Sequence, residues 1–151
     1  MRVALDTNIL VYAEGVNDVA MQQVALDLIR RLPVGETVLP AQTLGELFNV
    51  LVRKGGLAPA NARTRLLTWS DTYSVVETST SVIFGGADLA TDHSFGIWDA
   101  VIVSAAAEAG CRLLLSEDLQ DGFTWHGVTI VNPFAPSPNV LLGAALTEGG
   151  G

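Results

Sequence analysis

Short apolar runs alternate with longer amphipathic segments along the chain. Five such runs predict strands, at residues 3–5, 37–39, 74–77, 112–115 and 128–131. The segments between them have apolar residues at helical spacing and predict helices, at residues 16–31, 41–54, 58–71, 79–92 and 98–109. Strands that alternate with helices form βαβ units, so we expect an α/β fold: a three-layer sandwich with a parallel sheet between two layers of helices.

The predicted helices differ in which of their sides are apolar. Segment 41–54 has one apolar stripe, with Glu46 on the opposite, polar side; the stripe consists of Leu44, Leu47, Phe48 and Leu51. Segment 98–109 is apolar on nearly every side, which predicts a central, buried helix. In segment 16–31 the residues at helical spacing are Val19, Ala20, Val24, Leu28 and Ile29. Gly85 and Gly86 lower the helical propensity of segment 79–92.

The length of 151 residues suits one domain, which we place at residues 1–134, followed by a tail at 135–151. The tail begins Pro- and Ser-rich and then becomes apolar at 140–146, which suits either a docked short helix or a contact with a partner. The most apolar segment, 97–115, is interrupted by charged residues and predicts no membrane span. Because the N-terminus lacks the pattern of a signal peptide, we expect a cytoplasmic protein.

Charge and cysteine content narrow the possible functions. The net charge of −8 disfavours nucleic-acid binding by charge alone, unless divalent cations offset clustered carboxylates. It also suits a partner protein with basic arms, and both possibilities stay open. The single Cys111 excludes an internal disulfide and is expected to be a small core residue.

Four carboxylates come from separate segments that a parallel sheet would bring together. Asp6 follows the first predicted strand and Asp118 follows the fourth. Asp99 lies in the first turn of the apolar helix, and Glu46 projects from the polar side of another helix. Functional groups collect beyond the carboxyl ends of parallel strands, so these four can share one cleft. Asp6 has an alternative role as the cap of the next helix.

Such a cleft would have raised carboxylate pKa values or would hold a cation. Oxygen ligands without His or Cys favour Mg²⁺ or Mn²⁺. Neutral groups near the same positions suit the orientation of a ligand or a metal-bound water; these are Thr7, Asn8 and Ser116. Two further acidic candidates, Glu117 and Asp121, fit better as exposed loop carboxylates.

Four short motifs in order resemble the PIN domain family. They are Leu-Asp-Thr-Asn-Ile-Leu at 5–10, Leu-Gly-Glu-Leu at 44–47, Trp-Asp-Ala at 98–100 and Leu-Leu-Ser-Glu-Asp-Leu at 114–119. Asn-Pro-Phe at 132–134 is similar to the family's usual ending, and the single small domain most resembles the VapC-type toxins of toxin–antitoxin pairs.

The resemblance implies a five-stranded parallel sheet of order 3-2-1-4-5. It implies an endoribonuclease that depends on Mg²⁺ or Mn²⁺ and hydrolyses RNA through a metal-activated water. The acidic metal-binding positions of the family match Asp6, Glu46, Asp99 and Asp118. A homodimer and a cognate antitoxin that inserts near the site are also implied.

Other functions on a similar fold fit the sequence less well. Phosphatases of the haloacid-dehalogenase type need a second Asp two residues after the first, where this chain has Asn8. Receiver-like domains need a Lys after the last strands, and the only lysine is Lys54. A non-catalytic RNA- or protein-binding module would be expected to lose an acidic position, and none of the four is missing. Basic residues are few, so we assign no RNA contact to the group Arg53, Lys54, Arg63 and Arg65, and no catalytic role to His93.

Overall fold

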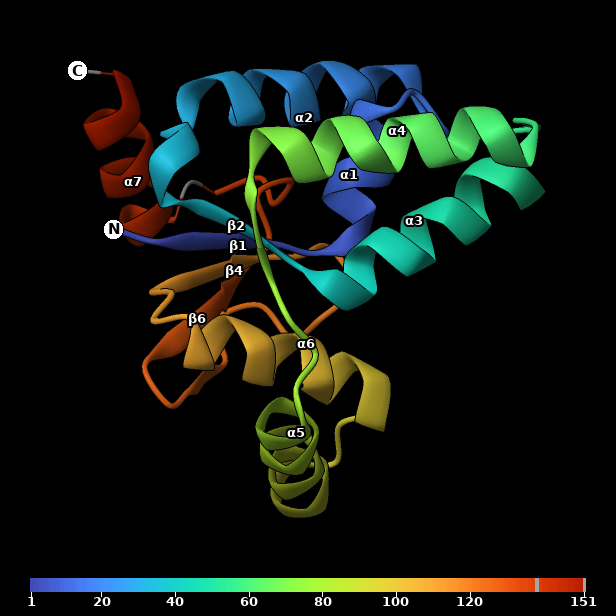
Figure 1. Cartoon of the computed structure of the whole chain (residues 1–151). Helices are drawn as coiled ribbons and strands as arrows, with labels where there is room; N and C mark the ends of the chain where they lie inside the picture. Colours follow the sequence, from blue (N-terminus) through green and yellow to red (C-terminus); the bar gives the residue numbers. More distant parts are fainter. Residues whose placement is uncertain (138, 151) are drawn as a thin grey trace.

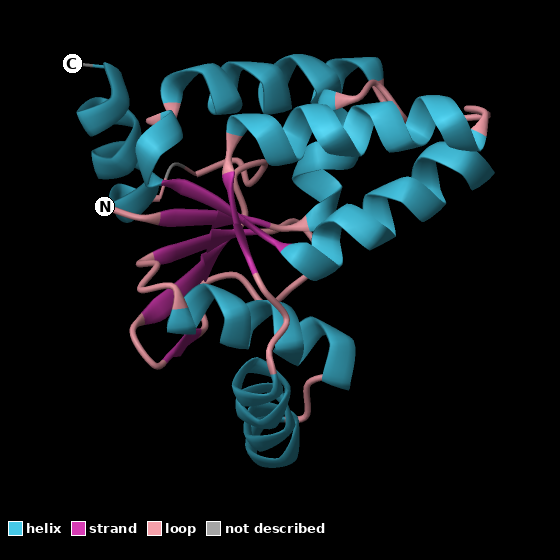
Figure 2. Cartoon of the chain, viewed as in Figure 1, coloured by secondary structure: helices cyan, strands magenta, loops and turns pink. Residues whose placement is uncertain are grey.

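A six-stranded sheet forms the middle layer of the molecule (Figures 1 and 2). The computed structural model describes residues 1–137 and 139–150, and its strand order is β3-β2-β1-β4-β6-β5. The strands are β1 (Val3–Leu5), β2 (Thr37–Pro40), β3 (Ser74–Val76), β4 (Leu113–Leu115), β5 (Thr124–Trp125) and β6 (Val128–Val131). All neighbouring strands are parallel except β5 and β6, which pair antiparallel.

The five predicted strands are present in the expected order, because β6 occupies the place of the predicted fifth strand. The difference is β5, a two-residue strand at the edge that the sequence did not predict. It joins β6 through His126 and Gly127, whose φ values are 46° and 86°. Positive φ at both central residues is typical of the tight two-residue turns that connect hairpins.

Helices cover both faces of the sheet, which confirms the three-layer prediction (Figure 2). One face carries α1 (Thr7–Ala13), α2 (Val19–Arg31), α3 (Ala41–Arg53), α4 (Pro59–Thr72) and α7 (Val140–Gly150). The other face carries α5 (Thr80–His93) and α6 (Ile97–Glu108). A single turn of 3-10 helix, η1 (Val34–Glu36), precedes β2. Within the described part of the chain, no helix has both the length and the apolar character that a membrane crossing needs.

Alternating strand residues supply two apolar cores, one on each face. On β1, Val3 and Leu5 pack beneath α1–α4, whereas Ala4 packs toward α5 and α6. Because both faces of the sheet are covered, the central strands β1 and β4 are apolar and buried throughout, as is typical of parallel sheets. The predicted central helix is confirmed: α6 is buried continuously from Ala100 to Ala106.

Two glycines that weakened the prediction of α5 are needed where α5 crosses α6. A Cβ on Gly86 would lie 2.8 Å from Cγ2 of Val101, and one on Gly85 would meet the hydroxyl of Ser104. The absent side chains therefore allow the two helices to approach closely, and this packing offsets the low helical propensity of glycine.

The buried side of α2 agrees with the expected one only in part. Leu28 is buried and Ile29 packs against the core, as expected. Val19 and Val24 are instead 75% and 43% exposed, and the helix buries Ala25. The tail contributes to the same region, since α7 packs on α2 and Leu142 joins the core cluster. Of the two possibilities that the sequence left open for the tail, this is the docked helix.

Candidate functional site

Polar residues gather at the edge of the sheet where β1 and β4 end. The backbone N–H of Asp6 donates to the carbonyl of Leu115 at 2.9 Å, so the two strand ends are held in register. Asp6 follows β1 directly, and Ser116 and Asp118 follow β4. This is the carboxyl edge of a parallel sheet, where α/β proteins build ligand sites.

Asp6 is the buried member of the acidic group, with only 6% of its surface exposed. Its Oδ1 accepts a hydrogen bond from the backbone N–H of Thr7 at 2.7 Å, which caps α1. Its Oδ2 accepts one from the hydroxyl of Ser116, also at 2.7 Å. Burial raises the pKa of Asp6 to about 6; the two hydrogen bonds oppose the shift, and the charges of Glu46 and Asp99 add to it.

The other three carboxylates are exposed and come from different elements. Glu46 lies on the polar side of α3, as predicted, and accepts from the Nε2 of Gln42 at 3.1 Å. Asp118 accepts from the Nδ2 of Asn8 at 3.1 Å. The pKa of Asp99 is raised, first by partial burial and then by the charge of Asp118.

These interactions link all four predicted carboxylates into one electrostatic group. Asp6 responds to Glu46 and Asp99, and Asp99 responds to Asp118. Because Coulomb repulsion weakens with distance, these mutual effects indicate that the four side chains lie in one region of the molecule. The fold therefore brings together acidic residues that are up to 112 positions apart in the sequence.

Two adjoining hollows give solvent access to this group. The first, which we call the acidic depression, has a volume of about 420 Å³, and its lining includes Thr7, Asn8, Glu46, Lys54 and Asp118. The second, of about 220 Å³, is lined by the loop before α6 together with Asp99 and Asp118. Asp118 lies in the wall of both, and Asp6 lies buried beside them.

Unpartnered oxygen atoms border the acidic group. The buried side-chain polar atoms without a hydrogen-bond partner in the described residues are Thr7 Oγ1, Gln42 Oε1 and Glu117 Oε2. All three are oxygens that can accept hydrogen bonds, and buried acceptors are costly without a donor. A hydrated cation supplies both positive charge and water donors, so the residues present fit a divalent metal ion.

No three carboxylate, imidazole or thiol groups of the described residues form a ready set of metal ligands. The absence of such a set limits how many side chains can bind a metal ion directly, but it does not prevent a hydrated ion from binding. Mg²⁺ usually keeps several of its waters and is bound through one or two carboxylates. The pKa values of Asp6 and Asp99 are raised, in both cases first by burial and then by neighbouring carboxylates, so these two side chains are the candidates for direct bonds to such an ion.

The supporting residues fall into two sets. Thr7, Asn8 and Ser116 lie at the site, and Asn8 also accepts from the backbone N–H of Glu117 at 3.2 Å. Asp121 lies apart from both hollows, where its Oδ1 accepts from the backbone N–H of Asn132 at 2.9 Å. That bond gives Asp121 a role in ordering the loop after β4.

Two features of the site were missed by sequence reasoning. Glu117 was expected to be an exposed loop carboxylate, but it is half-buried and accepts from the hydroxyl of Tyr12 at 3.0 Å. Burial, followed by this bond and charge, raises the pKa of Tyr12 to about 12. Lys54 lines the acidic depression, whereas Arg65 is bound to Glu14 at 2.8 Å in an internal ion pair. No local pattern distinguishes these cations in the sequence.

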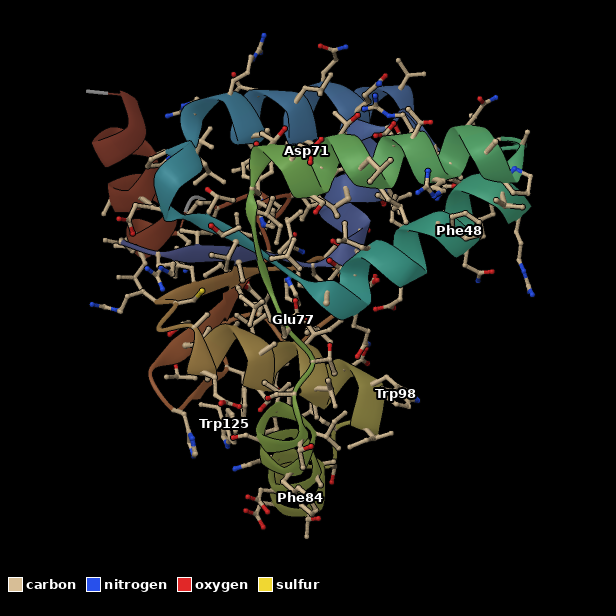
Figure 3. The ribbon with its side chains drawn as sticks, viewed as in Figure 1. Phe48, Asp71, Glu77, Phe84, Trp98 and Trp125 are labelled. Carbon is tan, nitrogen blue, oxygen red and sulfur yellow. The ribbon has the colours of Figure 1, made fainter. Side chains whose placement is uncertain are left out.

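A larger hollow, of about 530 Å³, lies elsewhere between α5, α6 and the β5–β6 hairpin. Phe84 and Trp125 lie in its lining (Figure 3). It is away from the carboxyl edge of the parallel strands and contains none of the four linked carboxylates. The acidic depression is therefore the better candidate for chemistry.

A family model described as the PIN domain matches residues 3–121. No curated protein matches the sequence. Several solved structures are similar in fold. A toxin–antitoxin complex from Klebsiella pneumoniae has 17% identity and a TM-score of 0.67, with 87% of this chain and 98% of that chain covered.

Two further structures have similar scores. VapC20 from Mycobacterium tuberculosis, a sarcin–ricin loop cleaving toxin, has 18% identity and a TM-score of 0.63, covering 74% of this chain and 86% of that one. FitAcB from Neisseria gonorrhoeae has 16% identity and a TM-score of 0.60, covering 87% and 98%. At these identities the likeness is one of fold.

Proposed function

The chain belongs to the PIN domain family, and we propose that it is a divalent-metal-dependent endoribonuclease, the toxin of a toxin–antitoxin pair. The observation that carries this proposal is the linked group of four carboxylates at the carboxyl edge of the sheet. Ordinary solvated carboxylates would not be kept together at the cost of mutual repulsion. A site that concentrates negative charge beside unpartnered oxygens suits a cation that in turn attracts phosphate.

The proposed roles follow from burial and bonding. Asp6 and Asp99 would hold a Mg²⁺ or Mn²⁺ ion, and Glu46 and Asp118 would complete the site or orient the attacking water. A bound divalent metal lowers the pKa of a water and stabilises charge on a phosphodiester. Ser116 fixes the Asp6 carboxylate through its 2.7 Å bond, and Asn8 steadies Asp118.

The partners are inferred from the similar structures. The similar structure from Klebsiella pneumoniae is a toxin–antitoxin complex. We therefore expect a cognate antitoxin that covers the acidic depression. A homodimer in the cytoplasm is expected from the family resemblance alone. A net charge of −8 suits an antitoxin with basic residues in the inserted segment.

The nuclease proposal is tested by incubating the purified protein with total cellular RNA and Mg²⁺ or Mn²⁺ and mapping the cleavage ends. Asp6→Asn and Asp99→Asn should each remove cleavage while the fold survives. Asp71→Asn is the matched control, because Asp71 is an exposed carboxylate on α4, away from the site (Figure 3). It should cleave like the parent protein.

Each result decides between two functions. Cleavage that is unchanged in Asp6→Asn would overturn the proposal, because a contaminating nuclease or another site would then be responsible. RNA binding without any metal-dependent cleavage would instead favour the non-catalytic binding module.

A further inference from the structure

Each of the two hollows at the acidic site is lined by one side chain that can carry positive charge. In the acidic depression it is Lys54, and in the second hollow it is His93. Within the described part of the chain, neither the ammonium group of Lys54 nor a ring nitrogen of His93 forms a hydrogen bond or an ion pair. Arg65, by contrast, is bound to Glu14. Both hollows therefore offer a donor that the fold itself does not use.

These two side chains come from helices on opposite faces of the sheet. Lys54 ends α3, where its backbone N–H donates to the carbonyl of Val50 at 2.8 Å. His93 is the last residue of α5, on the other face (Figure 1). Its ring packs edge-on against the ring of Phe123, with the centroids 5.2 Å apart and the planes at 71°. Because Asp118 lines both hollows, the acidic group lies between the two donors.

The charge of the protein indicates what such donors are needed for. An RNA strand that reaches the acidic group brings several phosphates with it. A metal ion would offset the charge of the scissile phosphate, but the phosphates on either side face a chain with 16 acidic and 8 basic residues. A donor beside each of these neighbouring phosphates reduces the repulsion, since phosphate contacts supply much of the affinity for a nucleic acid. The imidazole of His93 suits this role because it has an N–H donor whether it is neutral or charged.

We propose that an RNA strand crosses the carboxyl edge of the sheet, with the scissile phosphate at the acidic group and the flanking phosphates at Lys54 on one side and His93 on the other. This rests on the proposed nuclease function and adds the path of the substrate. Basic side chains at helix C-termini also have a purely structural role, because they interact favourably with the last carbonyl groups. A structural role alone predicts a loss of stability, without a change in RNA affinity, when the two residues are replaced.

The probe is a fluorescently labelled 12-nucleotide RNA that spans a cleavage site mapped in total RNA, or a 12-nucleotide uridine RNA if the parent cleaves nothing. Its Kd is measured with Mg²⁺ in the Asp6→Asn background, where the proposal expects the probe to stay intact, and KM and kcat are measured with Asp6 intact. Lys54→Ala should raise the Kd and KM about tenfold, with kcat within about twofold of the parent. It should also reduce the slope of log Kd against log salt by about 0.7, whereas Lys54→Arg should leave that slope unchanged.

Two replacements of His93 separate its N–H donor from its ring packing. His93→Phe keeps a ring against Phe123 but has no donor, so it should raise the Kd and KM about fivefold. His93→Gln keeps an N–H donor and should stay within about twofold of the parent. The matched controls are Arg30→Ala and His126→Asn, because Arg30 and His126 are exposed and line neither hollow at the site. Both controls should bind and cleave like the parent, and thermal unfolding establishes that each variant is folded.

The outcomes separate this inference from the proposed function. If the parent cleaves RNA and either Lys54→Ala or His93→Phe binds and cleaves as the parent does, the path is wrong and the nuclease proposal stands. A fall in kcat with KM unchanged, or weakening by His93→Gln equal to that by His93→Phe, also overturns the path. If the parent cleaves nothing but both variants weaken binding of the uridine RNA, the two RNA contacts stand and the nuclease proposal falls. A parent that neither binds nor cleaves RNA overturns both.

Discussion

Neutralising Asp6 should stabilise the metal-free protein at neutral pH. Its carboxylate is 6% exposed, and burial raises the pKa from 3.8 to about 6. The folded state therefore binds more protons than the unfolded state between these two pH values. Stability consequently falls as the pH rises through that window, and the full cost is present above about pH 6. A shift of about 2 units corresponds to about 3 kcal/mol.

Asp6→Asn removes this cost but also changes two hydrogen bonds. The Oδ1 of Asn can still accept from the N–H of Thr7, which preserves the cap on α1. The second contact reverses direction, because the Asn amide would donate to the hydroxyl of Ser116. The pKa of about 6 already includes the effect of both hydrogen bonds on the charged form, so their change adds no separate charge-related cost. We expect a net stabilisation of about 2–3 kcal/mol at pH 8 and none at pH 4.

The measurement is urea unfolding in EDTA at several pH values from 4 to 8, for the parent, Asp6→Asn and Asp71→Asn. The difference between the parent and Asp6→Asn should grow with pH and level off above about pH 6. Asp71→Asn, an exposed carboxylate, should show no such dependence. The reasoning is refuted if Asp6→Asn is less stable than the parent at pH 8, or if its difference from the parent is the same at every pH.

Three other substitutions test separate parts of the structure. Asp99→Asn should lower the pKa of Asp6, since it removes a like charge. It should also abolish the rise in melting temperature that Mn²⁺ gives the parent, and an unchanged rise would contradict the proposed role of Asp99 as a ligand. Gly86→Ala should destabilise the fold by about 1–3 kcal/mol in urea unfolding, because the added Cβ would lie 2.8 Å from a methyl of Val101. Stability equal to that of the parent would mean that α5 and α6 can separate without cost. Glu14→Gln should lower stability by about 1–3 kcal/mol through weakening of the contact with Arg65, and no loss would show that this ion pair contributes nothing.

Strand positions were predictable because both faces of this sheet are covered, whereas the strand order was implied only by the resemblance to the PIN domain family. Covered strands appear as uninterrupted apolar runs, and a polar residue then marks where each strand ends, as Asp6 and Ser116 do. The strand β5 was not predictable, because two residues do not form a periodic pattern. It depends on a turn at His126 and Gly127 and on pairing with β6.

The buried face of α2 could not be predicted from the periodic pattern, for a different reason. Several overlapping stripes run along this helix, and both Val24 and Ala25 belong to plausible ones. The choice between them is made by neighbours distant in the sequence. Ala25 meets the main core, and Val24 lines a hollow shared with Leu142 of α7. Glu117 was misjudged similarly, since its burial depends on Tyr12, 105 positions earlier.

Helix capping and a role in the site were alternative interpretations of Asp6, and the geometry makes them compatible. One oxygen caps α1 and the other accepts from Ser116, so both fix the orientation of the carboxylate. Each carboxylate oxygen has two lone-pair sites, and these bonds use one on each. The cap therefore holds a buried charge in a defined position with acceptor capacity to spare. A carboxylate held in this way would suit the proposed cation, and binding of the metal would then restore the stability that is lost in the metal-free protein.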